Sequence, residues 1–431
     1  DKKTIERIPI MDFVEIKEKM SRSGMMEVFP NFRVRKSRDL MVRGKAFYAV
    51  WDEKINMWST DEYDVVRLVD EELIAYKDKN RSNAPIMLKT LADFSSDMWT
   101  EFKSYINAQP DYYKPLDEKL TFLNTEVKRE DYVSKRLNYP LEPGSIDAYE
   151  ELISTLYVPE ERDILEWAIG SIIDGDSKTI QKFIVLYGEA GSGKSTILNI
   201  IQKLFKGYYT TFEAKTLTSN NNSFATEVFR NNPLVAIQHD GDLSKIEDNT
   251  KLNSIISHEV MTMNEKYKAA YMANTNCFLF MGTNKPVKIT DAKSGIIRRL
   301  IDVRPSGNKV SPKQYQILLS KIDFELGAIA THCLNKYREM GKNYYANYKP
   351  LDMMFQTDVF FNFIESNYIT FKEQNGISLT AAYELYKIYC DESLVEYKLP
   401  KHKFREELKS YFEAFYDMTR IDGKQIRSYY D

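Results

Sequence analysis

The stretch Lys182–Thr196 reads KFIVLYGEAGSGKST, in which an apolar run leads directly into a glycine-rich turn, a lysine and two hydroxyl residues. The run Phe183–Tyr187 has the composition of a buried strand. After the turn, apolar residues recur with helical spacing on one face: Ile197, Ile200, Ile201, Leu204 and Phe205. The stretch therefore predicts a strand, a glycine loop and a helix in immediate succession.

The loop fills the pattern G-x-x-x-x-G-K-[ST] of a phosphate-binding P-loop. Glycines let the backbone curl around a phosphate with its N–H groups pointing inward at a helix N-terminus. Lys194 would reach the β- and γ-phosphates of ATP, and the Ser195 hydroxyl would ligate Mg²⁺. A chance match in a loop is the alternative, and the strand before it and helix after it argue against that. The expected nucleotide-binding residues are Gly188, Glu189, Ala190, Gly191, Ser192, Gly193, Lys194, Ser195 and Thr196.

A second expected strand, PLVAI at Pro233–Ile237, ends in the sequence QHDGD. An acidic group at a strand end beside a P-loop can hold the magnesium through water or polarise the attacking water. Asp240 is the first choice for this role, as a catalytic and metal-binding residue, and Asp242 is the second. The alternative is a simple turn, since Asp-Gly is also a turn signal. His239 is given no role.

Two further patterns complete the set. The strand CFLFMGTN ends on Asn284, whose amide can sense the γ-phosphate and position water; an ordinary Asn-Lys-Pro turn is the alternative. In SGIIRRLIDV, Arg298 and Arg299 come just before a fourth strand. A buried guanidinium is rare without a partner. An arginine finger that completes a neighbouring subunit's site would explain at least one of them, and a salt bridge at the sheet edge is the alternative.

With these residues in order, the chain resembles a superfamily 3 helicase of the AAA+ class, in the phage and plasmid primase-helicase group related to the poxvirus primase-helicase. The resemblance spans Lys182–Pro305. GEAGSGKS corresponds to motif A, LVAIQHDGD to motif B, MTMNEKYK to motif B′, FLFMGTN to motif C and GIIRRL to the arginine finger. Motif B departs from the pattern, because relatives often end it in glutamate or an acidic pair where this chain has His239-Asp240. That departure leaves the water-polarising residue open.

Motif B′ has its own physical interpretation. MTMNEKYKAAYMANTNCFLF predicts a strand, a polar tip at Glu265–Lys268 and a return into the motif C strand. A tip that carries Lys266, Tyr267 and Lys268 can place cations on phosphate and a ring on sugar or base. The alternative is a solvated turn. The resemblance implies that this hairpin points into the channel of a ring and tracks single-stranded DNA.

Composition bounds the remaining possibilities. The chain has 431 residues, with 60 Lys+Arg against 63 Asp+Glu, so nucleic-acid contacts must come from local patches. Its three cysteines are far apart and form no zinc-ligand pattern or disulfide framework, which predicts a reducing compartment. No apolar run is long enough to span a membrane, and the given sequence shows no signal-peptide pattern. We expect a cytoplasmic protein, in the host cytoplasm if it is viral, and, because the chain begins with Asp1, a piece of a longer protein.

The predicted fold class is α/β, a P-loop AAA+ superfamily 3 helicase core with a preceding helical domain and a C-terminal winged-helix-like domain. In the β-rich segment 1–85, the strand candidates are FRVRKS, KAFYAVWDE and DVVRLV. A mostly helical pre-motor or collar domain is expected at 86–174, the ATPase domain at 175–305 and a helical connection at 306–360. At 361–431, two helices and a hairpin around Asp422-Gly423 suggest the winged helix.

Two functions follow. The first is an ATP-driven DNA helicase, which the resemblance implies to be a homo-oligomeric, hexameric ring that moves on single-stranded DNA in phage, viral or plasmid replication. The alternative is a P-loop initiator or switch ATPase that binds DNA or a partner without unwinding. Primase activity within this piece finds little support, and relatives often carry a primase domain upstream, so an upstream primase or another replication protein is an expected partner.

Overall fold

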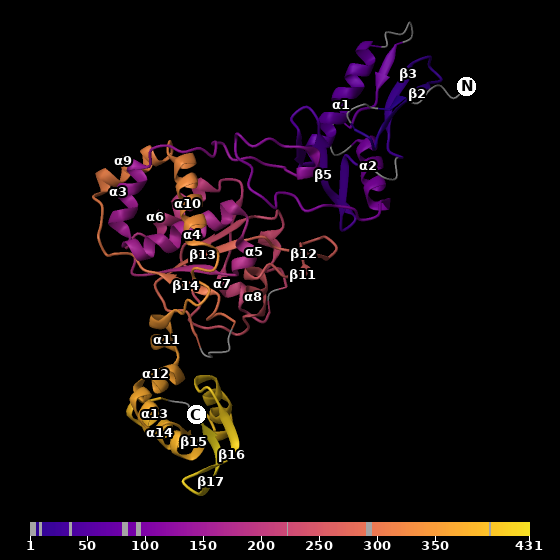
Figure 1. Ribbon diagram of the computed structural model, residues 1–431. Helices are drawn as coiled ribbons and strands as arrows, with labels where there is room; N and C mark the ends of the chain where they lie inside the picture. The colour runs from indigo at the N-terminus through magenta and orange to yellow at the C-terminus, as the bar shows by residue number, and fades with distance from the viewer. Residues whose placement is uncertain are drawn as a thin grey trace.

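The computed structural model describes residues 6–7, 11–33, 37–79, 85–91, 96–221, 223–289, 295–395 and 398–431. Figure 1 follows the chain through an N-terminal region of strands and helices, a central α/β region and a C-terminal region of helices and a hairpin. The protein is a mixed α/β structure built around a central parallel sheet. The central region carries the sequence motifs, and the other two regions flank it.

The described residues of the N-terminal region form two sheets and two helices, with an apolar core that includes Phe13, Val28, Leu68 and Phe102. One sheet has the order β1-β2-β3-β7, in which only β3 and β7 are parallel, and the other is the antiparallel sheet β4-β5-β6. The elements are β1 (Glu6–Arg7), β2 (Glu15–Met20), β3 (Met26–Asn31), β4 (Leu40–Arg43), β5 (Ala46–Asp52), β6 (Met57–Ser59), α1 (Glu62–Lys79), β7 (Ile86–Leu88) and α2 (Asp97–Ala108).

Of the strand candidates in this region, KAFYAVWDE is confirmed as β5, whereas DVVRLV at Asp64–Val69 is wrong. The latter lies in helix α1, which buries Val65, Leu68, Val69 and Leu73 with helical spacing. Acidic residues in its first turn and lysines in its last turn complement the helix dipole. The helical spacing of apolar residues over the whole of α1 outweighs the preference of its valines for β-strands. FRVRKS is not a strand at its described residues, and residues 34–36 lie outside the described chain.

The expectation of a mostly helical segment from 86 to 174 is only partly met. Helices α2, α3 (Asp147–Leu156) and α4 (Pro159–Asp174) are present, but from 109 to 146 the only helical turn is η1 (Arg129–Asp131). Prolines at 110, 115, 140 and 143 explain this, because proline breaks helices and restricts the residue before it. The segment runs between the N-terminal and central regions (Figure 1). It is tied to both, since Leu116 N donates to Tyr48 Oη and Thr121 N to Tyr208 Oη.

The central sheet has the order β14-β8-β13-β10-β9, and all neighbouring strands are parallel. Its strands are β8 (Phe183–Tyr187), β9 (Tyr209–Thr211), β10 (Val235–Gln238), β13 (Phe278–Thr283) and β14 (Leu300–Val303). Both faces are covered: Phe278 and Phe280 belong to one core, and Leu279 and Met281 to the other. This explains why the strands appear in the sequence as continuous apolar runs.

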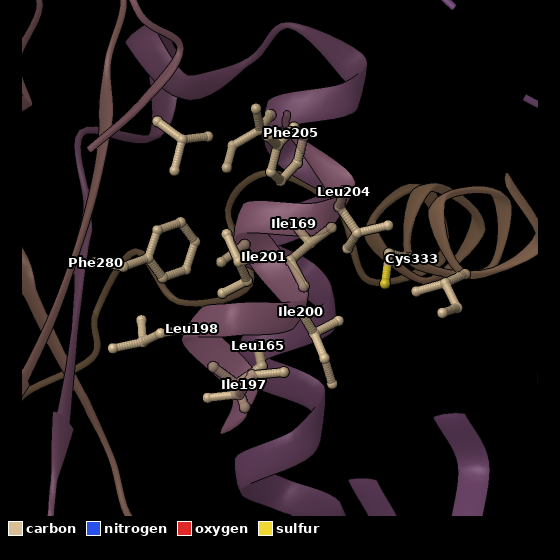
Figure 2. Close-up of a cluster of buried hydrophobic side chains, with 14 of the residues drawn as sticks. Leu165, Ile169, Ile197, Leu198, Ile200, Ile201, Leu204, Phe205, Phe280 and Cys333 are labelled. Atoms are coloured by element: carbon tan, nitrogen blue, oxygen red, sulfur yellow. The ribbon is translucent and has the colours of Figure 1, made fainter. Parts of the chain in front are cut away.

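Helices cover the two faces. On the first face, α6 (Lys194–Leu204) packs between the sheet and helices α4 and α10 (Leu326–Met340), as Figure 2 shows for Leu165, Ile201 and Cys333. Gly170 permits a close crossing of α4 and α10, because a Cβ there would lie 2.2 Å from the Cys333 carbonyl oxygen. The remaining elements of the region are α5 (Ser177–Ile180), α7 (Ala214–Leu217), η2 (Glu227–Phe229), α8 (Thr250–Ile256), β11 (Val260–Met263), β12 (Tyr271–Asn274) and α9 (Pro312–Ile322).

The C-terminal region contains the helices and the hairpin that the sequence predicts. Asp422 and Gly423 both have positive φ and join β16 to β17 in a two-residue turn. Phe363, Phe404 and Tyr430 lie in its core. The elements are α11 (Leu351–Thr357), α12 (Val359–Ser366), α13 (Tyr368–Glu373), β15 (Ile377–Ser378), α14 (Leu379–Glu392), α15 (Lys401–Leu408), η3 (Lys409–Tyr411), β16 (Phe415–Ile421) and β17 (Lys424–Tyr430).

Candidate functional site

The glycine loop joins β8 to α6, as predicted. Gly191 and Gly193 have φ of +74° and +105°, a backbone region that L side chains rarely adopt. A Cβ on Gly193 would also lie 3.2 Å from Leu156 Cδ2, and the Gly193 carbonyl accepts a hydrogen bond of 3.0 Å from Tyr157 Oη. These contacts hold the loop against the end of α3, and the loop leads directly into the N-terminus of α6. A helix N-terminus framed by such a loop is a ready anion site.

Lys194 is the first residue of α6, and only 9% of its surface is exposed. Its Nζ donates to the carbonyl oxygens of Gly188 and, at 2.7 Å, of Glu189. Burial lowers the pKa of Lys194, and the charge of Asp240 partly opposes this shift. Among the described residues, no carboxylate forms an ion pair with this ammonium group. A buried cation without a counter-ion favours an anionic ligand.

The loop opens into a cavity of about 390 Å³, a size that suits a small ligand. His239 and Asp240 reach it from the end of β10, and Asn284 from the end of β13. This convergence follows from the topology, because the carboxyl ends of neighbouring parallel strands meet at one edge of the sheet. The lining residues are Leu156, Ala190, Gly191, Gly193, Lys194, Ser195, Thr196, His239, Asp240, Asn284, Lys309, Val310 and Tyr315.

The two aspartates after β10 occupy different surroundings. Asp240 lines the cavity, whereas Asp242 does not. Asp242 accepts hydrogen bonds from the backbone and the hydroxyl of Ser244, at 2.9 and 2.5 Å, and its carboxylate lies 3.2 Å from Lys285 Nζ. Those Ser244 hydrogen bonds, with a smaller contribution from Lys285, lower the pKa of Asp242 to about 2. Asp242 therefore holds the turn, and Asp240 is the carboxylate that faces the loop.

Several cavity residues were missed by the sequence analysis. His239 lines the cavity, and its Nε2 lies 3.2 Å from Gln202 Nε2. Lys309 and Tyr315 come from the segment after β14, and the Tyr315 hydroxyl lies 3.3 Å from Thr196 Oγ1. The only sequence signal for Lys309 is its place in a polar Gly-Asn-Lys turn shortly after the last strand. Tyr315 belongs to α9, which packs against α3, so its place in the cavity depends on contacts between segments distant in the chain.

The two adjacent arginines differ in their burial. Arg299 is 5% exposed; its guanidinium donates to Ser257 Oγ at 3.0 and 2.8 Å and to the Gly295 carbonyl at 2.9 Å. Arg298 is exposed. Both precede β14 and lie at the start of β8, since Phe183 N donates to the Arg299 carbonyl. The glycine loop begins at the other end of β8, roughly 16 Å away at about 3.3 Å per residue. The Arg298 side chain therefore points to solvent from the edge opposite its own cavity.

The motif B′ hairpin is confirmed as β11 and β12, an antiparallel pair with Met263 opposite Tyr271. At its tip Lys266 is exposed, and Tyr267 is fully exposed with φ of +63°. Lys268 lies 3.5 Å from the buried carboxylate of Glu265. Figure 1 shows the hairpin projecting from the central region on the side of the N-terminal region. The tip presents a cation and an aromatic ring to solvent.

Comparisons with known proteins give limited matches. The profile of a family described as "Family of unknown function (DUF5906)" matches residues 186–299, which include the glycine loop and the ends of β10 and β13. Solved structures described as "The apo structure of NrS-1 C terminal region (305-718)" and "The A form apo structure of NrS-1 C terminal region-CTR" are similar to this chain. The first has 14% identity and a TM-score of 0.46, and covers 88% of this chain and 92% of that chain.

The second has 15% identity and a TM-score of 0.48, with coverage of 88% and 93%. Such values do not define an activity, so the functional argument rests on the site itself. Within the described part of the chain, no helix is both long and apolar enough to cross a membrane.

Proposed function

We propose that the chain is an ATP hydrolase and DNA helicase of the superfamily 3 AAA+ type. One observation carries this proposal: the Lys194 ammonium is buried and has no ion-pair partner among the described residues. It lies beside a glycine loop, in the cavity that Asp240 and Asn284 also line. A triphosphate supplies the anionic charge that such a lysine lacks. The parallel sheet, with the P-loop strand between its neighbours β13 and β14, supports the same class.

The residues of the cavity divide the work of hydrolysis. Loop N–H groups and Lys194 hold the β- and γ-phosphates, and the Lys194 ammonium gives up its carbonyl partners to do so. Asp240 polarises the attacking water, or would hold Mg²⁺ through water when the ion is bound, and the Asn284 amide positions the attacking water. Ser195 and Asp240 would hold Mg²⁺, which neutralises charge on the phosphates when bound. The oxygen donors of both residues suit this ion.

An assembly of several copies completes the site. Arg298 is exposed at the sheet edge opposite its own cavity, so it can stabilise the charge of hydrolysis only in a neighbouring copy. Such head-to-tail contacts close into a ring when the rotation permits, and a hexamer is the ring that we propose. Lys266, Tyr267 and Lys268 then face a shared channel and contact single-stranded DNA. The C-terminal region acts as a winged-helix-like module.

The experiment that tests the proposal compares two lysines of the same helix. Lys194→Ala removes the charge that holds the phosphates, so ATP turnover should fall below about a tenth of the wild-type rate. Lys203→Ala is the matched control, because Lys203 lies on α6 but forms an ion pair of 2.7 Å with Asp323 outside the cavity. Steady-state phosphate release measures both. Turnover of Lys194→Ala above that level, or an equal loss in Lys203→Ala, would overturn the P-loop assignment.

A further inference from the structure

A second polar cavity lies where the N-terminal region meets the central region. Its volume is about 390 Å³, within the range of ligand pockets. Its walls come from three parts of the chain: Arg43 and Tyr48 from the N-terminal region, Lys135 from the proline-rich connecting segment, and Arg230 and Lys268 from the central region. The N-terminal region, which has no function that the sequence reveals, thus contributes directly to a binding-sized space.

The charges in this cavity are unbalanced. Among the described residues, four cations line it, namely Arg43, Lys135, Arg230 and Lys268, against the carboxylates of Asp117 and Glu265. Glu265 is buried between two of the cations, 3.8 Å from Arg43 Nη2 and 3.5 Å from Lys268 Nζ. Asp117 is buried and accepts hydrogen bonds from the backbone, at 2.8 Å, and the hydroxyl of Ser134. Lys135 and Arg230 are left as the cations that the lining carboxylates do not pair.

Lys135 is the more enclosed of these two. Its ammonium lies over the Tyr208 ring, 4.9 Å from the centroid, and no carboxylate among the described residues forms an ion pair with it. Burial lowers the pKa of Lys135, and Asp117 only partly offsets this. Arg230 is 52% exposed along its side chain, and its one ion pair among the described residues is a long contact of 3.8 Å with Glu227. An anion bound in this cavity would give Lys135 and Arg230 an ion-pair partner.

Aromatic rings stand among the cations. Tyr48 lies under the Arg43 guanidinium, 4.3 Å from carbon to ring centroid, and Tyr209 lines the cavity with 36% of its surface exposed. Lys268 belongs both to this cavity and to the hairpin tip, directly after the exposed Tyr267. Cations beside an exposed ring, here Tyr209, are typical of surfaces that bind single-stranded nucleic acid.

We infer that this cavity, walled by Arg43, Lys135, Arg230 and Lys268, holds the phosphodiester backbone of the single-stranded DNA that leaves or enters the hairpin tip. The inference rests on the proposed function, which it deepens by making the N-terminal region part of the DNA path. Lys135 and Arg230 hold phosphate, and Tyr209 contacts sugar or base. The N-terminal region then acts as a wall that keeps the strand against the hairpin.

The test is a salt titration of single-stranded DNA binding, followed by fluorescence anisotropy of a labelled oligonucleotide without ATP. Arg230→Gln should lower the salt slope by about 0.7 and the affinity about fivefold at ~0.1 M salt, because each phosphate contact contributes about that slope. Lys135→Gln should do the same. The matched control is Arg338→Gln, since Arg338 is 60% exposed and pairs with Asp174 on a helix far from the cavity in the chain.

Loss in Arg230→Gln and Lys135→Gln but not in Arg338→Gln supports the inference. Equal losses in all three, or none in the cavity variants, overturns it. A cavity variant that loses competition by inorganic phosphate or AMP but keeps strand affinity and slope shows a free-anion site and also overturns it. The assay needs no hydrolysis, so a wild-type chain that binds DNA but releases no phosphate from ATP contradicts the proposed function alone.

Discussion

The cavity at the glycine loop and the tip of the β11–β12 hairpin both present lysine, but they present it in opposite ways. Lys194 is buried, held by two carbonyl oxygens and surrounded by groups from three strand ends. Lys266 and Tyr267 stand exposed on a turn. The described lining of the first site comes from one chain, so its ligand must fit the cavity between these strand ends. The hairpin tip is exposed, so the other half of any contact that it makes must come from a binding partner.

The largest expected effect concerns the two adjacent arginines, of which Arg299 is buried and Arg298 is exposed. Arg298→Ala should lower ATP turnover by roughly 10³–10⁵-fold, because an arginine supplied by a neighbour stabilises the charge of the transition state. Mixing this variant with Lys194→Ala should restore activity, since some shared interfaces then combine an intact P-loop with an intact Arg298. Phosphate release is measured before and after mixing.

The control for this pair is Arg298→Lys, which keeps the charge but not the two-pronged geometry, and should recover only part of the rate. Arg299 is unsuitable as a control, because its three hydrogen bonds to Ser257 and Gly295 make it part of the fold. Two inactive variants that co-assemble and remain inactive would contradict a trans arginine.

The next effect separates the two aspartates. Asp240→Asn should retain ATP binding and lose about 10²–10⁴-fold in turnover, because it removes the carboxylate that faces the loop. Asp242→Asn should retain most of the turnover, since Asp242 bonds to Ser244 and Lys285 outside the cavity lining. Single-turnover hydrolysis and nucleotide binding are measured on both. If Asp242→Asn is the inactive variant, the motif B assignment is displaced by two residues.

A smaller effect is expected at the hairpin tip. Replacing Lys266 and Tyr267 with alanine should abolish the DNA-stimulated increment of ATP turnover and fork unwinding together, because the strand is no longer held. Loss of the ring should cost about 1–3 kcal/mol per stacked base in single-strand affinity. The matched control replaces Lys342 and Tyr344, an exposed lysine and tyrosine after α10.

Fork unwinding and anisotropy are the measurements for these two double variants. Normal unwinding by the tip variant would show that the tip is a solvated turn. ATP hydrolysis stimulated by DNA without any unwinding by the wild-type chain would instead favour the switch ATPase.

The smallest effect concerns stability and pH. The pKa of Asp242 is lowered to about 2 in the folded chain, so its ionised form stabilises the fold at pH values above the ordinary aspartate pKa of about 3.9. Asp242→Asn should lower the melting temperature slightly at pH 7, because the carboxylate is 39% exposed and solvent screens it. The difference from wild type should shrink as pH falls from about 4 to about 2. A difference that is constant over this range would contradict the assignment of Asp242 to the turn.

Much of the central region could be predicted from local pattern. The apolar runs of β8, β10, β13 and β14, the glycine loop and the β11–β12 hairpin all follow from short-range periodicity and turn chemistry. The same reasoning failed at Asp64–Val69, where a window of six residues favoured a strand and the full length of α1 favours a helix. It also overestimated helix between 109 and 146, where prolines and tertiary hydrogen bonds set an irregular path.

The sequence by itself determined the glycine loop between a strand and a helix, the order of the polar residues that follow the strands, and the turn at Asp422-Gly423, because each depends on neighbours only a few residues away. Tertiary structure alone decided that Asp240 and not Asp242 lines the cavity, that Arg298 is exposed while Arg299 is buried, and that Lys309 and Tyr315 join the site. It also decided that Arg43, Lys135 and Arg230 share one cavity. These outcomes depend on contacts between segments distant in the chain, whose geometry no local pattern encodes.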